Sequence, residues 1–393
     1  MQYTLRTVKA LSAGGHDVTF ATVYWYRPRR LFEIIVGLLF PAFKRKLSVK
    51  SDPEIESSKV QTRFSAFLLQ LFNRVQKKRV EESSYIDDRW QDKWVAKWVK
   101  KNKPDLVIGY EKSCLKTFTV AKQYGAITWL DLSQVHPNYI ATLREIYPFF
   151  KTITGGESLF QAISKHKISE YEVADKIFSL SQFAKSTLSQ NSIDETKVVV
   201  NSLGYDPSIF YPSPLKTINN NKPLKLIYAG IITKRKGIHL LLEAINSFQS
   251  REVELILIGP KSDASYLIDT YESRIKINYI EACAQDKLAD YFREADVFVF
   301  PSYLDSWAAV VPEAMACGLP IITTTATGSS QLVTSDCGFV IESNNIDALE
   351  AAIQYFIDNK SSIQVMGNAA SIAVEKYSWK KYSERLLQQL CAV

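Results

Sequence analysis

The chain has 393 residues, of which 46% are apolar, enough to build the cores of two domains of ordinary size. Its five cysteines are odd in number and show no C-x-x-C spacing, which argues against a disulfide framework and a structural zinc site and favours a reducing cytoplasm. Residues 1–220 hold 32 Lys and Arg against 21 Asp and Glu, whereas residues 221–393 hold 16 against 20. The basic first half predicts an anionic partner, either a membrane surface or a phosphorylated acceptor, unless it is simply a lysine-rich solvated surface. No nucleic-acid-binding module is recognisable, so that partner is not expected.

The first predicted element is a helix, Thr4 to Ala13, followed by a turn and a strand from Gly14 to Phe20. We expect no cleavable signal peptide, because Met1 to Asp17 lacks an apolar core and leads directly into that strand.

The segment Arg27 to Lys46 has thirteen mostly apolar residues, Leu31 to Phe43, between two groups of three cations. It is too short to span a bilayer, which takes ~20 apolar residues, and Pro41 interrupts it. It is either an interfacial segment on an anionic membrane or a buried helix with charged ends.

The rest of the first half alternates predicted helices and strands. Trp90, Trp94 and Trp98 are four residues apart, and this stripe predicts core packing against a sheet. Leu106 to Gly109 and Ile127 to Leu132 are predicted strands. A linker rich in Asn, Pro and Ser, 213–223, ends this half.

The second half alternates strands and helices in a pattern that predicts a parallel sheet with right-handed crossovers. The predicted elements are 224–229, 237–247, 254–258, 265–272, 277–280, 288–295, 297–300 and 319–323.

A short helix beginning near Val310 and Val311 follows the strand that ends at Pro301; Pro312 suits its first turn and Gly318 its end. Ligands of such sheets bind beyond the carboxyl ends of the strands, where a helix start attracts anions. We therefore expect a diphosphate there, bordered also by Gly230, after the strand 224–229, and by Gly328, in a Gly-Ser-Ser turn.

Charged residues at the same strand ends suit a nucleotide sugar. Lys234, Arg235 and Lys236 would hold a diphosphate, and the carboxylates of Asp305 and Glu313 would accept hydrogen bonds from sugar or ribose hydroxyls.

The stretches AGIITKRKGIHLLLEAI and DSWAAVVPEAMACGLPIITT resemble the second domain of the retaining GT-B glycosyltransferases of family 4. The resemblance implies an α/β fold of two Rossmann-like, doubly wound domains facing a cleft. It implies an acceptor-side domain at 1–215, a nucleotide-sugar domain at 222–376, and a helix at 377–393 that crosses back to the first domain.

The resemblance also implies residue roles. The family's Lys that contacts the donor diphosphate falls on Lys236, and one of its two Glu residues falls on Glu313. Three positions depart from the pattern: Asp305 stands for the other Glu, Ile231 for an Arg, and Gln331 for a later Glu.

Two residues of the first half match the family less specifically. His136 is the best match to a polar residue that faces the acceptor, although a lone histidine is also often a structural hydrogen-bonder. Glu111, after the strand 106–109, is a second candidate on the same argument.

The family begins with a strand and a Gly-rich loop, and here the helix comes first; we expect that this sequence is truncated at its start, with divergence as the alternative. The expected activity is transfer of a sugar from a UDP-, GDP- or ADP-sugar to a saccharide or lipid-linked acceptor, with retention and without a metal or other cofactor. We expect this in polysaccharide or glycolipid synthesis, in the cytoplasm or on the inner face of the plasma membrane. The alternative is a catalytically weak scaffold, which the departures at positions 231, 305 and 331 motivate.

Overall fold

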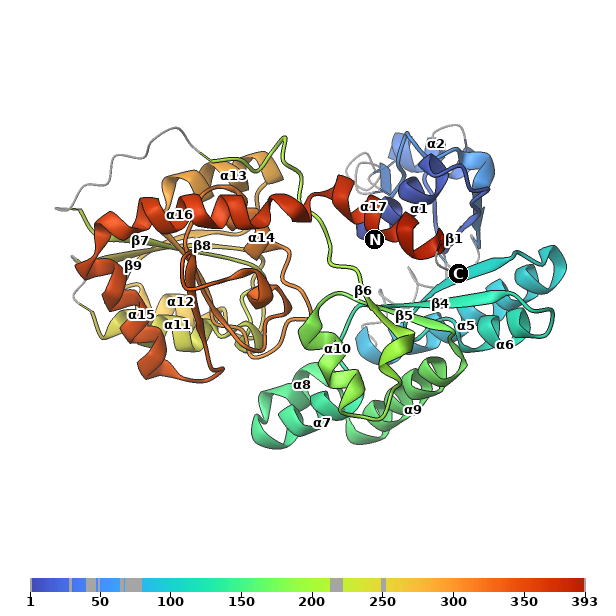
Figure 1. Ribbon diagram of the computed structural model, residues 1–393, viewed down its shortest axis with the longest axis horizontal. Helices are drawn as coiled ribbons and strands as arrows, with labels where there is room; N and C mark the ends of the chain where they lie inside the picture. Colours follow the sequence, from blue (N-terminus) through green and yellow to red (C-terminus); the bar gives the residue numbers. More distant parts are fainter. Residues whose placement is uncertain are drawn as a thin grey trace. The chain divides into compact units, whose positions relative to one another are not determined.

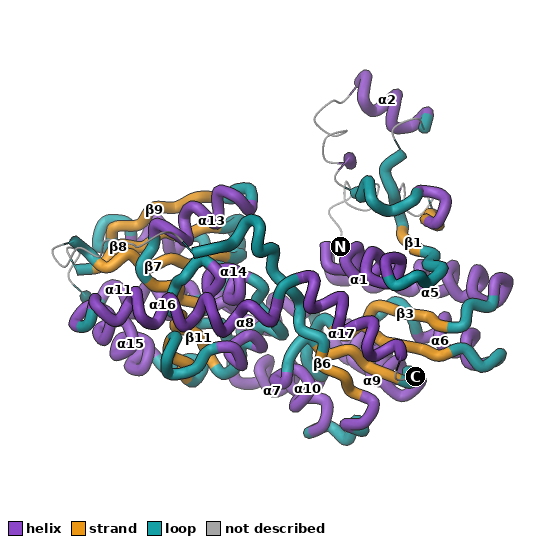
Figure 2. The backbone as a smooth tube through the Cα atoms, turned by 45° about the horizontal axis from the view of Figure 1, so that its top comes forward, coloured by secondary structure: helices purple, strands orange, loops and turns teal. Residues whose placement is uncertain are grey.

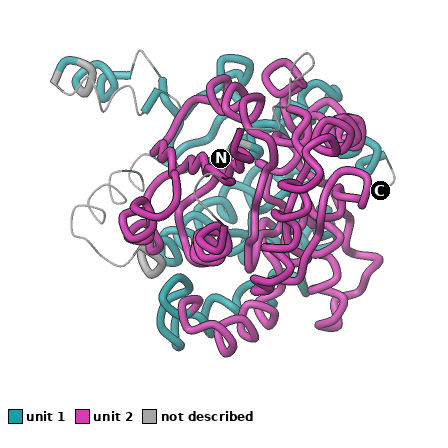
Figure 3. The backbone as a smooth tube through the Cα atoms, turned by 90° about the vertical axis from the view of Figure 1, so that its left-hand side faces the viewer, with its two compact units in different colours: residues 1–132, 151–178, 383–393 teal, residues 133–150, 179–382 magenta. Residues whose placement is uncertain are grey.

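The computed structural model describes residues 2–27, 30–39, 47–48, 50–63, 67, 80–212, 222–248 and 252–391. The chain divides into two compact units (Figure 3). Unit 1 holds Met1–Leu132, Lys151–Phe178 and Ser383–Val393, and unit 2 holds Ser133–Phe150 and Ser179–Tyr382. Each unit combines segments that are distant in the sequence. The domain bounds in chain order, 1–215, 222–376 and 377–393, therefore stay a prediction.

Unit 2 is built on a six-stranded parallel sheet. In spatial order its strands are β12 (Gly338–Ile341), β11 (Ile321–Thr324), β10 (Val297–Phe300), β7 (Leu224–Ala229), β8 (Val253–Ile258) and β9 (Lys276–Ile280). From β7 the chain proceeds outward to β8 and β9, and from β10 it proceeds the other way to β11 and β12. The order reverses between β7 and β10, so the ligand crevice is expected beyond the carboxyl ends of these two strands.

Helices cover both faces of this sheet because its strands are apolar on both sides; Leu226, Ile227, Phe298 and Val299 are fully buried. Figure 1 shows α13, α14 and α16 over one face and α11, α12 and α15 over the other. The helices are α11 (Ile238–Asn246), α12 (Tyr266–Tyr271), α13 (Gln285–Glu294), α14 (Val310–Ala316), α15 (Ile346–Asp358) and α16 (Lys360–Val374).

Unit 2 also contains α7 (Pro137–Ile146), α10 (Gln182–Ser189) and the turn between α7 and α8 (Phe149–Thr154). Tyr147 and Phe149 pack against Tyr303, with ring centroids 4.8 and 5.3 Å away. Tyr303 stacks on His239 of α11 and donates a hydrogen bond to Asn344. An aromatic cluster thus joins residues 147–149 to the second half of the chain.

In unit 1, β3 (Leu106–Tyr110), β4 (Ile127–Leu132) and β5 (Lys176–Ser179) lie in one sheet, whose full order is β3-β4-β5-β6, with β6 at Val198–Val200. A separate parallel pair joins β1 (Phe20–Thr22) to β2 (Val60–Thr62). The helices are α1 (Gln2–Ala13), α5 (Val80–Asn102), α6 (Leu115–Lys122) and α9 (Glu157–Val173).

The predicted C-terminal helix is α17 (Trp379–Cys391). Its last turns belong to unit 1, where Leu387 lies so close to Gly14 that a Cβ there would approach it to 2.5 Å. The helix therefore returns to the first part of the chain, as expected.

One predicted core stripe is wrong. Trp90 of α5 is 49% exposed, and its ring contacts Arg63 and Lys93. The buried side of α5 carries Asp92, Ala96 and Val99 instead. Asp92 lies inside because it accepts hydrogen bonds from the start of α6, a constraint that aromatic spacing does not reveal.

The segment Arg27–Lys46 contains α2 (Leu31–Leu39), while residues 28–29 and 40–46 lie outside the described residues. The same holds for residues 213–221 of the predicted linker. Of the helices that the structure describes, none combines the length and the apolar character needed to cross a membrane.

Candidate functional site

An ion pair between Lys236 and Asp305 lies at the switch point of the unit 2 sheet. Lys236 ends the short 3-10 helix η3 (Lys234–Lys236) after β7, and Asp305 lies in the loop after β10. The Lys236 Nζ contacts the Asp305 Oδ2 and lies 5.1 Å from the centre of the Phe300 ring. The two side chains are only 9% and 18% exposed.

Burial controls the electrostatics of this pair. It lowers the pKa of Lys236, an effect that the Asp305 carboxylate only partly offsets. Burial also raises the pKa of Asp305, but the charges of Lys236 and Arg235 and the hydrogen bonds to its carboxylate outweigh burial and bring the pKa below its usual value. In such a water-poor place a phosphate would interact strongly with both cations.

Gly237 fixes the position of Lys236. Its φ of 76° lies in the left-handed region, and a Cβ there would come within 1.9 Å of the carbonyl oxygen of Pro301. Only glycine lets η3 lie directly on the end of β10. Arg235 is held there too, because its Nη1 donates to the carbonyl of Leu304 at 2.7 Å. Gly230, with φ 150°, lies at the end of β7.

The loop before α14 is shaped by Asp305. Its Oδ1 accepts hydrogen bonds from the backbone N–H groups of Trp307 and Ala308, at 3.1 and 2.9 Å. Ala308 adopts φ 57°, a left-handed conformation that costs a non-glycine residue about 1–2 kcal/mol. Val310, half-buried, and Val311, buried, then begin α14. Asp305 thus pairs with Lys236 and holds the strained turn into α14.

Glu313 lies in the first turn of α14 and differs from every other acid of this region. Burial raises its pKa from 4.5 to about 8. Within the described residues, its carboxyl group has no hydrogen bond or ion pair. It therefore retains its full hydrogen-bonding capacity for a ligand, and at neutral pH it is largely protonated.

The loop that carries Asp305 is fastened to other segments of unit 2. The Ser306 Oγ donates to the carbonyl of Ser133 at 2.6 Å, and the Ser181 Oγ donates to the carbonyl of Ser306 at 2.8 Å. Gly328 packs so closely on Ser306 that a Cβ there would lie 2.0 Å from the Ser306 oxygen.

Gln331, at a position where the sequence departs from the expected pattern, has a structural role. Its Oε1 accepts a hydrogen bond from the backbone N–H of Gln182 at 2.8 Å, and its Nε2 donates to the Ser202 Oγ. An amide does both, whereas a carboxylate only accepts. Ile231, another of the three departures, is 47% exposed and supplies no cation.

Comparison with known proteins relates the part of the chain that contains these residues to a glycosyl transferase family. Residues 214–372 match the family model of the glycosyl transferases group 1. A D-inositol 3-phosphate glycosyltransferase of Paenarthrobacter aurescens is 24% identical over 213 residues, which are 50% of this chain and 52% of that protein. The capsular polysaccharide biosynthesis glycosyltransferase CapM of Staphylococcus aureus is 26% identical over 59% of this chain and 64% of its own length. The chain thus spans 52% and 64% of the lengths of these two relatives.

Solved structures extend the likeness to the whole fold. Sucrose-phosphate synthase from Thermosynechococcus elongatus aligns with a TM-score of 0.70 and 19% identity, over 99% of this chain and 93% of that chain. Anabaena Alr3699/HepE in complex with UDP aligns with a TM-score of 0.65 and 14% identity, over 96% and 100%. The chain has the GT-B glycosyltransferase fold. The fold class predicted from the sequence is confirmed, and the group 1 match covers the Lys236, Asp305 and Glu313 region.

In this GT-B chain His136 caps the start of α7. It is 2% exposed, its Nδ1 accepts a hydrogen bond from the backbone N–H of Asn138, and its own N–H donates to the Thr187 Oγ1. These contacts fit the structural interpretation of His136. An acceptor-side role stays a prediction.

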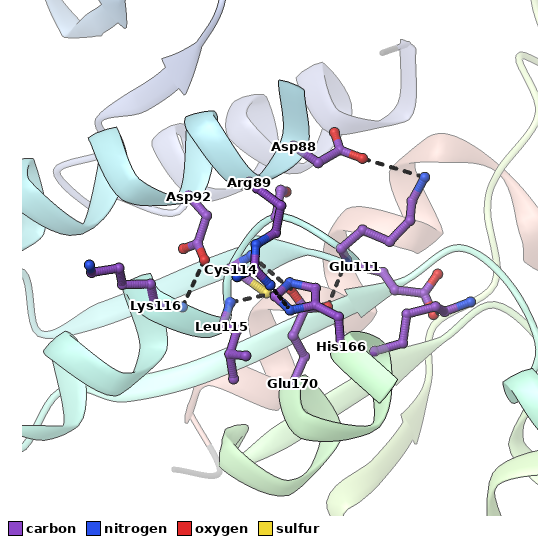
Figure 4. A network of polar contacts seen from close by, with 12 residues as sticks. Asp88, Arg89, Asp92, Glu111, Cys114, Leu115, Lys116, His166 and Glu170 are labelled. Carbon is purple, nitrogen blue, oxygen red and sulfur yellow. Dashed lines mark hydrogen bonds and ion pairs between the residues drawn. The ribbon is translucent and has the colours of Figure 1, made fainter. Parts of the chain in front are cut away.

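Glu111 lies in unit 1, inside a buried polar network near the carboxyl ends of β3 and β4 (Figure 4). Its Oε1 contacts the Lys167 Nζ at 2.8 Å and accepts a hydrogen bond from the Tyr171 hydroxyl at 2.5 Å. Asp131 is also buried at this end of β4, and burial raises its pKa to about 7. A role of Glu111 in acceptor binding stays a prediction.

Two further carboxylates of this network hold the start of α6, and sequence reasoning missed both. Glu170 accepts hydrogen bonds from the backbone N–H groups of Lys112, Cys114 and Leu115. Asp92 accepts from those of Lys116 and Thr117, both at 2.8 Å. Carboxylates thus occupy the donors of this helix start, which leaves it no place for a phosphate. The sequence signal for this role is an acid on the buried face of each helix, α5 and α9. The buried faces are known only from the structure.

Proposed function

We propose that this protein transfers a sugar from a nucleoside-diphosphate sugar to a saccharide or lipid-linked acceptor. The observation that carries the proposal is the ion pair of Lys236 and Asp305 beyond the carboxyl ends of β7 and β10. Its cation suits a diphosphate. Glu313, in the first turn of the helix that follows β10, has no partner within the described residues and suits hydroxyls.

Relatives support the class of donor and product. Anabaena Alr3699/HepE has been solved with UDP and with UDP-glucose. The relatives include glycosyltransferases of capsular polysaccharide and, putatively by name, colanic acid biosynthesis, from Staphylococcus aureus and Escherichia coli. We therefore propose a UDP-, GDP- or ADP-sugar as donor and a surface polysaccharide or glycolipid as product.

The proposed chemistry breaks the bond between the anomeric carbon and the diphosphate oxygen. The diphosphate leaves with the electron pair, and Lys236 and Arg235 stabilise its charge. The acceptor hydroxyl attacks the same face of the sugar, and a leaving phosphate oxygen takes its proton. The configuration is thereby retained, as in family 4, to which we assign the chain. The two cations make a metal unnecessary in this scheme.

Asp305 and Glu313 have different roles in the proposal. Before the donor binds, Asp305 holds the Lys236 ammonium group near the strand ends. The diphosphate of the bound donor then also interacts with this ammonium group. Glu313 takes ribose or sugar hydroxyls, which would replace the solvent that burial excludes and lower its pKa from about 8. Donor binding should therefore release protons at neutral pH.

Localisation is proposed from cysteine chemistry. All five cysteines are unpaired, and Cys283 and Cys391 are exposed. Exposed thiols persist in a reducing compartment, so we place the reaction in the cytoplasm.

A panel of UDP-, GDP- and ADP-sugars tests the proposal. We expect one nucleotide to bind, measured by calorimetry in two buffers of different ionisation enthalpy to count released protons. Its sugar should be transferred or slowly hydrolysed, with the anomeric configuration of the product read by NMR. Binding of a nucleotide without turnover of any of its sugars would favour the scaffold alternative, and inversion would refute retention.

A further inference from the structure

The second half of α5 presents a row of lysines to solvent. Residues 93–103 contain five lysines and no acid, and all five lysines are exposed. Lys116 of α6, the helix beside α5, is exposed as well, and its backbone N–H donates to Asp92 of α5 (Figure 4). We call these six residues the lysine face: Lys93, Lys97, Lys100, Lys101, Lys103 and Lys116.

Helix geometry gathers these lysines on one side of α5. At roughly 100° per residue, the four lysines within the helix lie within roughly 100° of one another around its axis. The buried side carries Asp92, Ala96 and Val99 instead. The helix leads through residues 103–105 into β3 (Figure 2). One side of α5 therefore packs within unit 1, and the described residues leave its lysine side open to solvent.

The charges of the lysine face are not neutralised by the protein. None of its six lysines forms an ion pair within the described residues. Two nearby acids are engaged elsewhere, because Asp88 pairs with Lys112 at 3.5 Å and Asp92 holds the start of α6. Lys93 and Lys97 are four residues apart, a spacing at which like charges destabilise a helix, and both lie too far from its C-terminal end to gain from the helix dipole. The result is a field of one sign that suits an anionic partner.

Trp90 extends the same side of α5 toward the start of the helix. Its side chain is 49% exposed, and the Lys93 ammonium lies 5.7 Å from the centre of its ring. The exposed part of the indole offers an apolar surface on which the C–H face of a sugar ring can pack, next to cations. A membrane suits this side of α5 less well, because no exposed apolar side chain lies within residues 93–103 to enter a bilayer.

We propose that the lysine face and Trp90 bind an anionic saccharide chain, whose sugars carry carboxylates or phosphates. The choice of a saccharide rests on the proposed function, because the acceptor and the product of sugar transfer would contain one. Residues 90–102 of α5 span about 18 Å, so a single small anion meets few of the lysines, whereas a chain of several charged sugars meets them all. Lysines suit such a polymer, because their flexible side chains follow it without requiring one fixed geometry.

The test is the affinity of the full chain, without donor, for fluorescent oligogalacturonates of graded length, measured by anisotropy. We expect binding that strengthens with the length of the oligomer and weakens with salt. Maltooligosaccharides of the same lengths carry no charge and should not bind. Lys93→Gln combined with Lys97→Gln and Lys101→Gln should weaken the binding of the longest oligogalacturonate at least about tenfold, because three cations beside its carboxylates are lost.

The matched control is Lys276→Gln with Lys287→Gln and Lys380→Gln, three exposed lysines of unit 2. It removes the same charge from other surfaces and should leave the affinity unchanged. Bound oligogalacturonate should also raise the melting temperature of the wild type more than that of the variant of α5, because it neutralises the repulsion along this helix. An equal loss of affinity in the control, or no binding of the wild type at low salt, would overturn the proposal.

Trp90→Ala separates a saccharide from other polyanions. It should weaken the binding of oligogalacturonate more than that of polyphosphate, which has no C–H face to pack on the ring. Equal effects on both probes, or tighter binding of single-stranded DNA or of phosphatidylglycerol vesicles than of oligogalacturonate, would overturn the choice of a saccharide. These measurements involve neither Lys236 nor Glu313, so a chain that binds oligogalacturonate but transfers no sugar would contradict the proposed function and not this inference.

Discussion

Two buried polar clusters, one in each unit, use their carboxylates in different ways. In unit 1, Glu170 and Asp92 accept five backbone N–H groups between them, and Glu111 is engaged by Lys167 and Tyr171. In unit 2, Glu313 has no partner within the described residues, and Lys236 depends on Asp305 alone for its ion pair. The first cluster is largely satisfied by the protein itself, whereas the second leaves capacity for a ligand.

Whether a carboxylate already has partners within the protein distinguishes structural charges from ligand-binding charges better than the burial of the carboxylate does. Both clusters are fully or partly shielded from solvent, and both contain a carboxyl group whose pKa burial raises, Asp131 in unit 1 and Glu313 in unit 2. If the comparison holds, changes in unit 1 should reduce stability and spare donor binding, while changes in unit 2 should mainly affect the donor.

The largest expected effect is on stability. Glu170→Ala leaves three backbone donors, one buried and two part-buried, without their acceptor and should reduce the free energy of unfolding by about 3–5 kcal/mol. Urea titration measures it, and Glu172→Ala, an exposed acid on the same helix, is the control. Nucleotide affinity of the folded protein should not change. A Glu170 variant that is stable but no longer binds nucleotide would break the comparison.

Next in size is the loss of Lys236. Lys236→Ala should reduce kcat/KM for the verified donor by about 2–4 kcal/mol of transition-state stabilisation, because a cation beside the leaving diphosphate is lost. Lys225→Ala, at the opposite end of β7 and paired on the surface with Glu254, is the control. Near-wild-type turnover of the Lys236 variant would remove this residue from the site.

A smaller effect concerns pH. The folded pKa of Glu313 is about 8 against 4.5 for the free group, so its stabilising contribution is complete below pH 4.5 and is lost as the pH rises to 8. Glu313→Gln has no such loss and should be more stable than the wild type at pH 8.5 by about 2 kcal/mol, but not at pH 4.5. This expected difference in unfolding free energy is smaller than the full pKa difference of Glu313 would give, because solvent screens a side chain that is only half-buried.

Urea unfolding at several pH values gives the measurement for Glu313→Gln. Glu281→Gln, which removes an exposed carboxyl group, is the control. A Glu313 variant with the same difference at every pH would show that the carboxyl does not titrate in this range.

The smallest effect distinguishes charge from geometry at position 305. Asp305→Glu should keep more transfer activity than Asp305→Ala, by about 1 kcal/mol, because a carboxylate remains beside Lys236. Both variants should lose some stability, since neither reproduces the short Asp side chain that accepts from Trp307 and Ala308. Equal activities would show that Asp305 serves only the loop.

Much of the fold could be predicted because buried parallel strands are continuous apolar runs. Four strands were predicted correctly, at 224–229, 254–258, 277–280 and 297–300. Their observed ends differ from the predicted ends by at most one residue. The glycine and proline signals placed the start and end of α14 in the same way. The local sequence is sufficient where burial on both faces allows only one kind of residue.

The partners of the site residues could not be predicted, because they depend on contacts across the fold. Lys236 and Asp305 are 69 positions apart, and nothing local indicates that they pair. His136 could be interpreted in two ways from the sequence. Its position before Pro137 fits a helix cap as well as a catalytic residue, and the structure favours the cap. The same lack of long-range information concealed Glu170 and Asp92.

The aromatic cluster around Tyr303 has a consequence for how this protein can be divided. A polypeptide starting at residue 222 would contain every strand of the six-stranded sheet but would lack Tyr147 and Phe149, and also the Ser133 carbonyl and the Ser181 hydroxyl that fasten Ser306. The rings of Tyr303 and His239 would then face water, and the turn at Asp305 would lose two of its anchors. A second half cut from the chain at residue 222 is therefore not expected to fold and bind a ligand on its own.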